Sequence, residues 1–588
     1  MRLFRIVLCA AVLAPAAAGG GPAGGDARSV AFVHANVVPM DDDRLLRDQT
    51  VVVSGGRIAA VGPTGTIPVP RGARVIDAAG RYLSPGLADM HVHLYAPQEL
   101  TLYVVNGVTT VFNLNGRPAY LGWRQRIARG ELLGPTIYSA GPTFDRPRTP
   151  AEAVAEVDRQ AAAGWDAVKI YNQVSAAEYP ALTAEARAKG LVLVGHVPRE
   201  PGFAATLSAG QSIAHAEEYV YTFFNDDSDP KNEVVHPLDT GKIPKAVDLT
   251  REAGISVIPT LVAFHNIVRQ ATDVKAYLRN PDLDLMPPFM RAQLEPDANT
   301  YANRWTSDKR PGLALSYEFQ RQLVKALHEG GVPILAGTDA SWLGVPGFSL
   351  LEEIENFQDL GFTPYAALKT ATVDPAKLLR REGEFGALEV GKRADLILTR
   401  RNPLEDVRRL RQPDGVMVKG RWIDAAERRR IVEGLPASYR ASLAKLTREA
   451  REDPKALDAY LESNDPWGEI GGAVLAAIAA DRGSAGLISL LEEIHRTDPK
   501  SPLLAEEAVN QLGYGLARKN ETDAAIAIFK LNTELYPSSG NTYDSLAETY
   551  LAAGDRERAR QSYAKALEVQ PDYPNAKAAR EILETGLP

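Results

Sequence analysis

The chain has 588 residues, of which 45% are hydrophobic and 24% charged, and its formal net charge is -8. This length exceeds one ordinary hydrophobic core, so the sequence predicts a soluble globular protein with two or more domains. Acidic and basic residues are intermixed, and no basic stretch dominates any segment. The charge pattern therefore argues against a nucleic-acid partner.

The N-terminus has the features of an export signal. Two arginines precede the apolar run Ile6–Ala14, and the alanines at 16–18 have the small-residue form of a cleavage site, which predicts a signal peptide at residues 1–18 and a flexible leader at 19–29. No later segment offers about 18 uninterrupted apolar residues, so we expect no membrane span. We therefore expect a periplasmic or secreted protein. Its only cysteine, Cys9, would be lost on cleavage.

Short β-rich runs punctuated by glycine and proline occupy residues 30–84, which is typical of antiparallel strands. Residues 386–428 have the same character. We interpret the two segments as one small β-sandwich that is built from both flanks of the region between them.

Residues 85–385 alternate apolar strands with amphipathic helical stretches such as 149–164, the pattern of βα units in a parallel sheet. The eight predicted strands are 86–94, 107–114, 135–142, 166–171, 191–197, 212–218, 256–261 and 333–340. Eight such units predict an α/β fold with a (β/α)8 TIM-type barrel, whose chemistry lies at the C-terminal ends of the strands. Two long connections, 219–240 and 265–312, are predicted to be lids or binding loops.

The tail is predicted to be all-α, with a helical region at 431–510 and two tetratricopeptide repeats at 511–588. The repeats are indicated by residue pairs 34 positions apart: Leu512 and Leu546, Ala525 and Ala559, Phe529 and Tyr563, Pro537 and Pro571. An ordinary helical bundle is the alternative. Two repeats rarely fold alone, so we expect them to stack on the helices that precede them.

Six residues that could bind metal fall in or beside the predicted barrel strands. His91 and His93 are two positions apart on the first strand, so their side chains share one face. Each residue alone has an ordinary explanation, such as a buried histidine, a helix-capping aspartate or an edge-strand lysine. Together they predict a divalent-metal site at the barrel mouth, formed by His91, His93, Lys169, His196, His215 and Asp339.

Eight segments, taken in order, resemble the amidohydrolase superfamily over roughly residues 30–428. They are "PGLADMHVHL", "GVTTVFNLNG", "DAVKIY", "GHV", "SIAHAEE", "ILAGTDA", "GFTPYAALKTATVDPAKLL" and "GALEVGKRADLIL". The resemblance is to the branch with imidazolonepropionase-like proteins and prolidase-like dipeptidases, and it implies a metal-bearing barrel flanked by a β-sandwich.

The resemblance also implies roles for the six residues. His91, His93 and Asp339 would bind one divalent ion, His196 and His215 a second, and zinc is the expected metal. Lys169 matches a lysine that is carboxylated and bridges both ions in binuclear members. Asp339 would act as base and then as acid while metal-activated hydroxide cleaves the amide or peptide bond of a small molecule.

Some positions depart from the family pattern. Val197 and Pro198 follow His196, where prolidase-like relatives usually have a polar or aromatic residue, and Phe112-Asn113 stands where many relatives have Arg-Asp. Glu353 matches an acidic position common in the branch, although a solvated helix face would explain it equally well. The remaining histidines are predicted to be surface, lid or packing residues, with His265 a weak candidate for substrate contact: His34, His236, His265, His328 and His495.

Two other functions remain open. The first is a mononuclear deaminase or imidazolonepropionase-like cyclic amide hydrolase, in which Lys169 stays unmodified. The second is a non-catalytic protein whose repeats bind a partner protein by their concave surface. In an enzyme, the repeats could still recruit a partner or mediate dimerisation.

Overall fold

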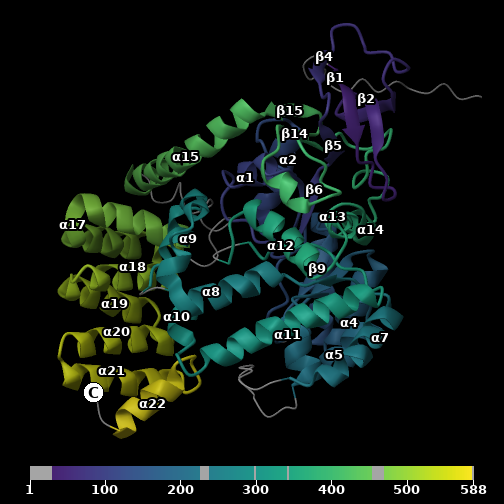
Figure 1. The fold of residues 1–588 in the computed structure, drawn as a ribbon. Helices are drawn as coiled ribbons and strands as arrows, with labels where there is room; N and C mark the ends of the chain where they lie inside the picture. Colours follow the sequence, from purple (N-terminus) through teal and green to yellow (C-terminus); the bar gives the residue numbers. More distant parts are fainter. Residues whose placement is uncertain are drawn as a thin grey trace, which may run out of the picture.

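A computed structural model describes residues 29–146, 148–225, 238–296, 299–340, 343–452 and 469–585. The predicted signal peptide and nearly all of the leader lie outside the described residues. No helix in the described ranges is both long enough and apolar enough to cross a membrane. Figure 1 shows a β-sheet near one end of the molecule, a mixed α/β region beside it, and a stack of helices from the C-terminal part of the chain.

Both flanks of the mixed region contribute to one eight-stranded sheet. Its strand order is β15-β14-β13-β5-β1-β2-β3, with β4 also paired to β1. The strands are β1 (Val30–Val37), β2 (Leu46–Ser54), β3 (Arg57–Pro63), β4 (Arg74–Asp77), β5 (Tyr82–Pro85), β13 (Leu396–Thr399), β14 (Gly415–Val418) and β15 (Arg421–Asp424). The junction between the flanks is the antiparallel pairing of β13 with β5.

The predicted all-antiparallel arrangement of the N-terminal strands is wrong in part. Strands β4 and β5 pair parallel to β1, because β2 and β3 occupy one edge of β1 and the chain then crosses to its other edge. The sheet also curls until two of its turns touch. A Cβ on Gly420 would lie 2.8 Å from the Cα of Gly56, so this contact depends on glycine.

The mixed region contains two parallel sheets. One contains β6 (Leu87–Val92), β7 (Val108–Asn113) and β8 (Thr136–Ser139), and the other contains β9 (Ala167–Ile170), β10 (Val192–Gly195), β11 (Ser212–Ala214) and β12 (Val257–Ile258). Isolated parallel bridges link the ends of these sheets at Ala140–Ala167, Val257–Ile334 and Val92–Ala340. The parallel strands confirm the predicted α/β class.

The predicted eighth strand, 333–340, is not a continuous strand. Only its ends, Ile334 and Ala340, form bridges. Between them the backbone N–H groups of Thr338 and Asp339 both donate to the His91 carbonyl, and Asp339 has a left-handed φ of 51°. The chain therefore turns out of the ladder at the residue that carries the candidate ligand.

Helices follow the parallel strands and cover them. They are α1 (Leu100–Val105), α2 (Pro118–Ala128), α3 (Pro150–Ala163), α4 (Tyr179–Ala188), α5 (Gly202–Ser208), α6 (Glu217–Tyr219), α7 (Ile243–Ala253), α8 (Leu261–Tyr277), α9 (Pro288–Ala292), α10 (Thr300–Arg304), α11 (Arg310–Glu329), α12 (Phe348–Asp359), α13 (Pro364–Lys369) and α14 (Val373–Leu378). Short helical turns are η1 (Val220–Phe224), η2 (Thr240–Lys242), η3 (Pro281–Leu285) and η4 (Val407–Arg411).

Helix α3 confirms the prediction for 149–164, because Thr149 and Glu152 form a capping box and Gly164 ends the helix with a φ of 86°. By contrast, the predicted long loop at 265–312 is largely helical, since it contains most of α8 together with η3, α9 and α10. The other predicted loop, 219–240, begins with η1, and its residues 226–237 lie outside the described ranges.

The C-terminal part of the described chain is helical, as predicted. Its first helix, α15 (Ala425–Glu452), begins before the expected residue 431 and contacts α1. The following elements are α17 (Glu469–Thr497), η5 (Pro502–Leu504), α18 (Glu506–Arg518), α19 (Thr522–Leu535), α20 (Gly540–Ala552), α21 (Arg556–Val569) and α22 (Ala576–Thr585). Helices α18 and α20 begin 34 residues apart, as do α19 and α21.

Candidate metal centre

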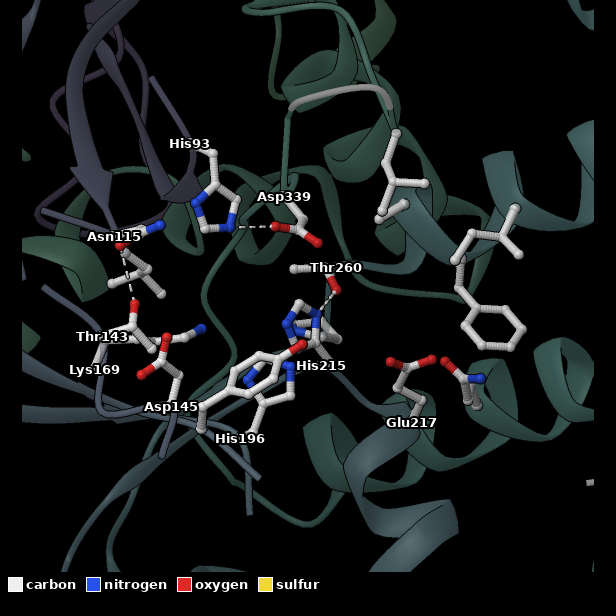
Figure 2. Close-up of a pocket in the computed structure, with 18 of the residues that line it drawn as sticks. His93, Asn115, Thr143, Asp145, Lys169, His196, His215, Glu217, Thr260 and Asp339 are labelled. Carbon is white, nitrogen blue, oxygen red and sulfur yellow. Dashed lines mark hydrogen bonds and ion pairs between the residues drawn. The ribbon is translucent and has the colours of Figure 1, made fainter. Parts of the chain in front are cut away.

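The structure brings all six predicted site residues to one cavity of about 360 Å³. His91 lies at the end of β6 with His93 just beyond it, Lys169 lies in β9, and the other three follow β10, β11 and the bridge at Ile334. The side chains that line the cavity are His93, Lys169, His196, His215 and Asp339 (Figure 2). His91 lies beneath them and is 0% exposed.

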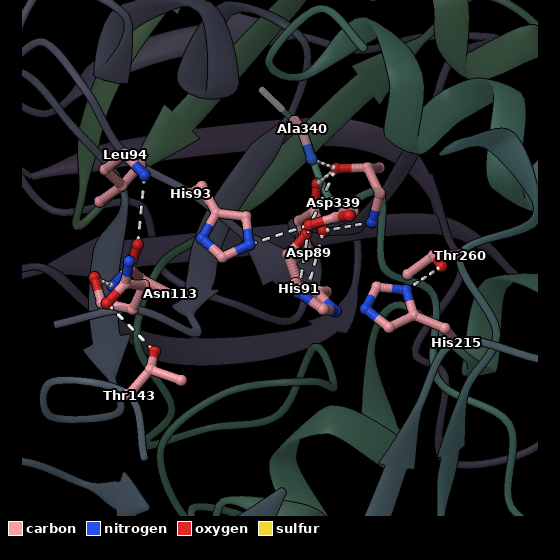
Figure 3. Close-up of polar contacts among 12 residues, drawn as sticks. Asp89, His91, His93, Leu94, Asn113, Thr143, His215, Thr260, Asp339 and Ala340 are labelled. Atoms are coloured by element: carbon pink, nitrogen blue, oxygen red, sulfur yellow. Dashed lines mark hydrogen bonds and ion pairs between the residues drawn. The ribbon is translucent and has the colours of Figure 1, made fainter. Parts of the chain in front are cut away.

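Asp339 is the shared neighbour of the first two histidines. Its Oδ1 lies 2.9 Å from Nε2 of His93 and 3.2 Å from Nε2 of His91 (Figure 3). The ring of His215 lies 4.7 Å from that of His91 and 4.7 Å from that of His196, centroid to centroid. Within the described residues, one ligand atom from each of His91, His215 and Asp339 falls within 4.8 Å of the others. This grouping takes two members of the first ligand set inferred from sequence, His91 and Asp339, and one member of the second, His215.

Several buried nitrogens in this centre have no hydrogen-bond partner. They are both ring nitrogens of His91, Nδ1 of His196 and Nζ of Lys169. Nε2 of His91 contacts Oδ1 of Asp339 at 3.2 Å but forms no hydrogen bond with it. Each such atom costs about 1–3 kcal/mol when it is left unsatisfied in the folded protein. Imidazole nitrogens and a carboxylate oxygen are donors that suit a divalent ion such as zinc. The residues present therefore fit a metal centre.

Burial sets the protonation of these groups. It lowers the pKa values of His91 and His196 well below 6.5, and that of His215 to about 4. Burial also lowers the pKa of Lys169 to about 8. Burial alone would raise the pKa of Asp339, but the neighbouring His91 and other histidines outweigh it and hold that pKa well below 3.8. His91, His196 and His215 are thus neutral and Asp339 is ionised, the forms that bind metal.

Asp89, which the sequence interpretation missed, ties β6 to the segment that carries Asp339. Its buried carboxylate accepts hydrogen bonds from the His91 N–H at 3.3 Å, the Thr338 N–H at 3.1 Å and the Thr338 hydroxyl at 2.7 Å. Burial raises the pKa of Asp89 to about 7. A signal for it existed, because Asp89 precedes His91 by two residues and so shares its face of the strand.

A second support chain runs from Glu353 to His215. Nδ1 of His215 lies 2.8 Å from the Thr260 hydroxyl, which orients the ring with Nε2 available to a metal. The next two backbone N–H groups, those of Leu261 and Val262, donate to the Glu353 carboxylate at 2.9 and 2.7 Å. Glu353 is 0% exposed, so its interpretation as part of a solvated helix face is wrong.

None of the other described histidines is among the residues that line the cavity. His34 contacts Asp48 at the surface, and His328 stacks on Phe362 with ring centroids 3.5 Å apart. His265 stacks on Tyr317 and is not a lining residue, so the structure does not support its assignment as a substrate contact. His495 lies in the last turn of α17, and His236 lies outside the described residues.

Two of the sequence departures beside the site are packing positions. Val197 and Phe112 are each 0% exposed. The backbone N–H of Val197 donates to Glu218 at 3.0 Å. An apolar residue after His196 therefore contributes to the core.

Comparisons with known proteins agree with this geometry. The profile of the amidohydrolase family matches residues 82–423, which is more than half of the chain, so the chain belongs to this family. It is 25% identical over 381 residues to an adenine deaminase of Paracoccus denitrificans, which covers 61% of this chain and 52% of the relative. It is also 25% identical over 372 residues to an imidazolonepropionase of Streptomyces coelicolor, a match that covers 60% of this chain and 86% of the relative.

Among solved structures, a putative prolidase from Bifidobacterium longum superposes with a TM-score of 0.52 at 25% identity, covering 70% of this chain and 99% of that one. This likeness and the family match define a TIM-barrel-like α/β fold. The first curated relatives that the chain matches are three adenine deaminases. The matches cover 15%, 52% and 14% of the lengths of these relatives, so the chain spans about half of them or less.

Proposed function

We propose that this protein is a divalent-metal-dependent hydrolase that cleaves the amide C–N bond of a small molecule. The observation that carries the proposal is the set of buried nitrogens without hydrogen-bond partners on His91, His196 and Lys169. Lys169 and His196 line one cavity with Asp339, and His91 lies beside it. A centre that leaves them unsatisfied is suited to binding a metal.

In the binuclear form of the proposal, His91, His93 and Asp339 would hold one zinc ion, and His196 and His215 would hold the other. Lys169, once carboxylated, would supply anionic oxygens to this centre. Support comes from its buried amine, whose pKa of about 8 leaves an appreciable neutral fraction near pH 7, the form that reacts with carbon dioxide. Bound divalent ions supply a nucleophilic hydroxide near neutral pH and polarise the carbonyl of the scissile bond.

The chain's own residues would then manage the proton. Asp339 is ionised and 17% exposed to the cavity, so its carboxylate can take a proton there. The same group can deliver that proton to the departing nitrogen, acting as base and then as acid. Asp89 and Thr338 hold the backbone that presents Asp339, and Thr260 holds the ring of His215.

A mononuclear deaminase or cyclic amide hydrolase is the second candidate. The specific observation in its favour is that His91, His215 and Asp339 surround a single point, as one ion would require. Adenine deaminases and imidazolonepropionases among the relatives are consistent with it. A non-catalytic binding protein is less well supported, because such a protein has no need of unsatisfied nitrogens in a cavity.

The remaining features belong to the same proposal. The parallel strands would close as a (β/α)8 barrel at about 85–385, with the composite β-domain at 30–84 and 386–428. The isolated bridges between the two sheets support closure. Helices beyond 431 would form a support for two tetratricopeptide repeats at 511–588, in line with their 34-residue spacing. Export to the periplasm would follow from the signal peptide at 1–18.

The test is metal content and hydrolysis of purified mature protein grown with zinc and bicarbonate. We expect about two metal ions per wild-type chain and hydrolysis of a panel of acyl-amino acids and dipeptides. Both the metal content and the hydrolysis should fall in His91→Ala and in Lys169→Ala. Lys245→Ala is the matched control, because Lys245 is exposed on α7. One ion that survives Lys169→Ala would favour the mononuclear enzyme, and a metal-free wild type without hydrolysis would refute both enzymatic candidates.

A further inference from the structure

The cavity lining is poor in cations. Among the described residues that line it, Lys169 is the only lysine or arginine, and the proposed function commits Lys169 to the metal centre. Two carboxylates beyond Asp339 line the same cavity, Asp145 and Glu217. In Figure 2 they lie on opposite sides of His196 and His215. A ligand bound at the histidines therefore lies between two acidic side chains.

Glu217 differs from its neighbour Glu218 in its partners. Glu218 is 1% exposed and pairs with Arg199, whose guanidinium nitrogen lies 2.7 Å away. Glu217 forms no ion pair with a described residue, and its side-chain contact is the Tyr221 hydroxyl at 3.4 Å, longer than a good hydrogen bond. A partly buried carboxyl group with no ion-pair partner among the described residues is a position at which a cationic ligand can form a charge-assisted hydrogen bond.

The rest of the lining suits a chain of methylene groups. Ala263, Phe264 and Ile267 lie within the first two turns of α8 and line the cavity, and Tyr301 of α10 lines it as well. Apolar and aromatic walls pack against an aliphatic stem and also attract a cation over their rings. An acidic group beside such walls matches a ligand with an alkylammonium or guanidinium end.

We propose that the substrate is an amide that carries a basic group, bound as a cation by Glu217, and that amides with a carboxylate in the place of that basic group are disfavoured. Asp145, exposed at the cavity rim, adds attraction for the same charge. This inference rests on the proposed amide hydrolysis and adds the class of substrate to it. Away from the proposed metal ions, a carboxylate would meet Glu217 and Asp145, and the described lining contains no lysine or arginine other than Lys169.

The test compares amides that differ only in charge. N-acetyl-lysine, N-acetyl-norleucine and N-acetyl-glutamate p-nitroanilides vary the acyl side, and N-acetylcadaverine and N-acetylpentylamine vary the amine side. In at least one of the two series, the wild-type kcat/KM for the cationic amide should exceed the kcat/KM for the neutral amide by about tenfold or more. This is the effect of one charge-assisted hydrogen bond. Glu217→Gln should reduce that ratio to near one, and Asp145→Asn should reduce it less.

Glu252→Gln is the matched control, because Glu252 is exposed on α7 outside the cavity lining, and the ratio should stay at its wild-type value. Equal rates for cationic and neutral amides in the wild type, a preference for the glutamate derivative, or a ratio unchanged in Glu217→Gln would overturn the inference while leaving amide hydrolysis intact. If no amide is cleaved, the proposed function fails, and calorimetry then tests the inference alone. Pentylamine should bind the zinc-loaded wild type more tightly than it binds the zinc-loaded Glu217→Gln variant. If the wild type binds pentanoate more tightly than pentylamine, the inference is overturned.

Discussion

Glu353→Gln tests the support chain behind His215 through its dependence on pH. Burial raises the pKa of Glu353 from its ordinary 4.5 to about 8 in the folded protein. Between these values the unfolded chain releases a proton that the folded protein keeps, so the free energy of unfolding falls as the pH rises. At 1.36 kcal/mol per pH unit, the loss amounts to about 4–5 kcal/mol by pH 8.

Glutamine keeps the shape of the side chain and one acceptor oxygen but cannot titrate. The free energy of unfolding of the variant should therefore not fall with pH through this group. At pH 5 we expect the variant to be less stable than wild type by about 1 kcal/mol, since one of the two N–H groups of Leu261 and Val262 loses its acceptor. At pH 8 the order should reverse, with the variant more stable by a few kcal/mol.

The assay is urea unfolding of metal-free protein at pH 5, 6, 7 and 8, followed by tryptophan fluorescence. Five of the six tryptophans precede residue 425, so the signal reports mainly on the region that contains Glu353. Glu252→Gln, at an exposed position, is the control and should differ from wild type by a similar small amount at each pH. A stability difference between Glu353→Gln and wild type that is the same at pH 5 and pH 8 would refute the reasoning.

Three further predictions concern the centre itself. Thr260→Val removes the hydroxyl that lies 2.8 Å from Nδ1 of His215, and competition with a chelator should show zinc affinity reduced by about 10–100-fold. Gly337→Ala would place a Cβ 2.4 Å from Cγ2 of Ile258 and 2.9 Å from Cβ of His91, so chemical denaturation should show a loss of about 1–3 kcal/mol. A chelator should abolish amide hydrolysis by the wild type and added zinc should restore it; activity that persists in metal-free protein would contradict the proposed chemistry.

Features that depend on residues close together in the sequence were predictable from the sequence. Helix α3 follows from its own cap residues and glycine stop, and the shared face of His91 and His93 follows from strand geometry. The role of the Glu353 carboxylate as an acceptor for the backbone beside Thr260 was not predictable, because its hydrogen bond with the Leu261 N–H joins residues 92 positions apart in the sequence. Its own sequence context is an amphipathic helix, which gives no sign of what the buried face touches.

The helical content of 265–312 was missed for a related reason. Several short helices there, such as α9 and α10, have only five residues each, too few for a periodic pattern to stand out. The packing of α9 against α17 and of α10 against α8 supplies contacts that such short helices cannot supply themselves. Tertiary contacts therefore determine this segment.

The interruption of the predicted eighth strand and the clustering of the predicted ligand residues have one physical cause. Three residues at the cavity, His215, Thr260 and Asp339, have left-handed φ values of 75°, 49° and 51°. Residues other than glycine adopt this conformation at a cost of about 1–2 kcal/mol each. Hydrogen bonds hold two of these turns, from the His215 N–H to the Ile258 carbonyl at 2.8 Å and from the Asp339 N–H to the His91 carbonyl at 2.7 Å.

The turns end regular pairing where the functional side chains begin. A strand that continued through Asp339 would alternate its side chains between the two faces of the sheet. The left-handed turn instead places the Asp339 carboxylate beside the rings of His91 and His93. Strand propensity alone cannot predict this interruption, because the free energy that stabilises it comes from the other strands around the cavity. The same interruption is what lets residues from several strands reach the candidate metal centre.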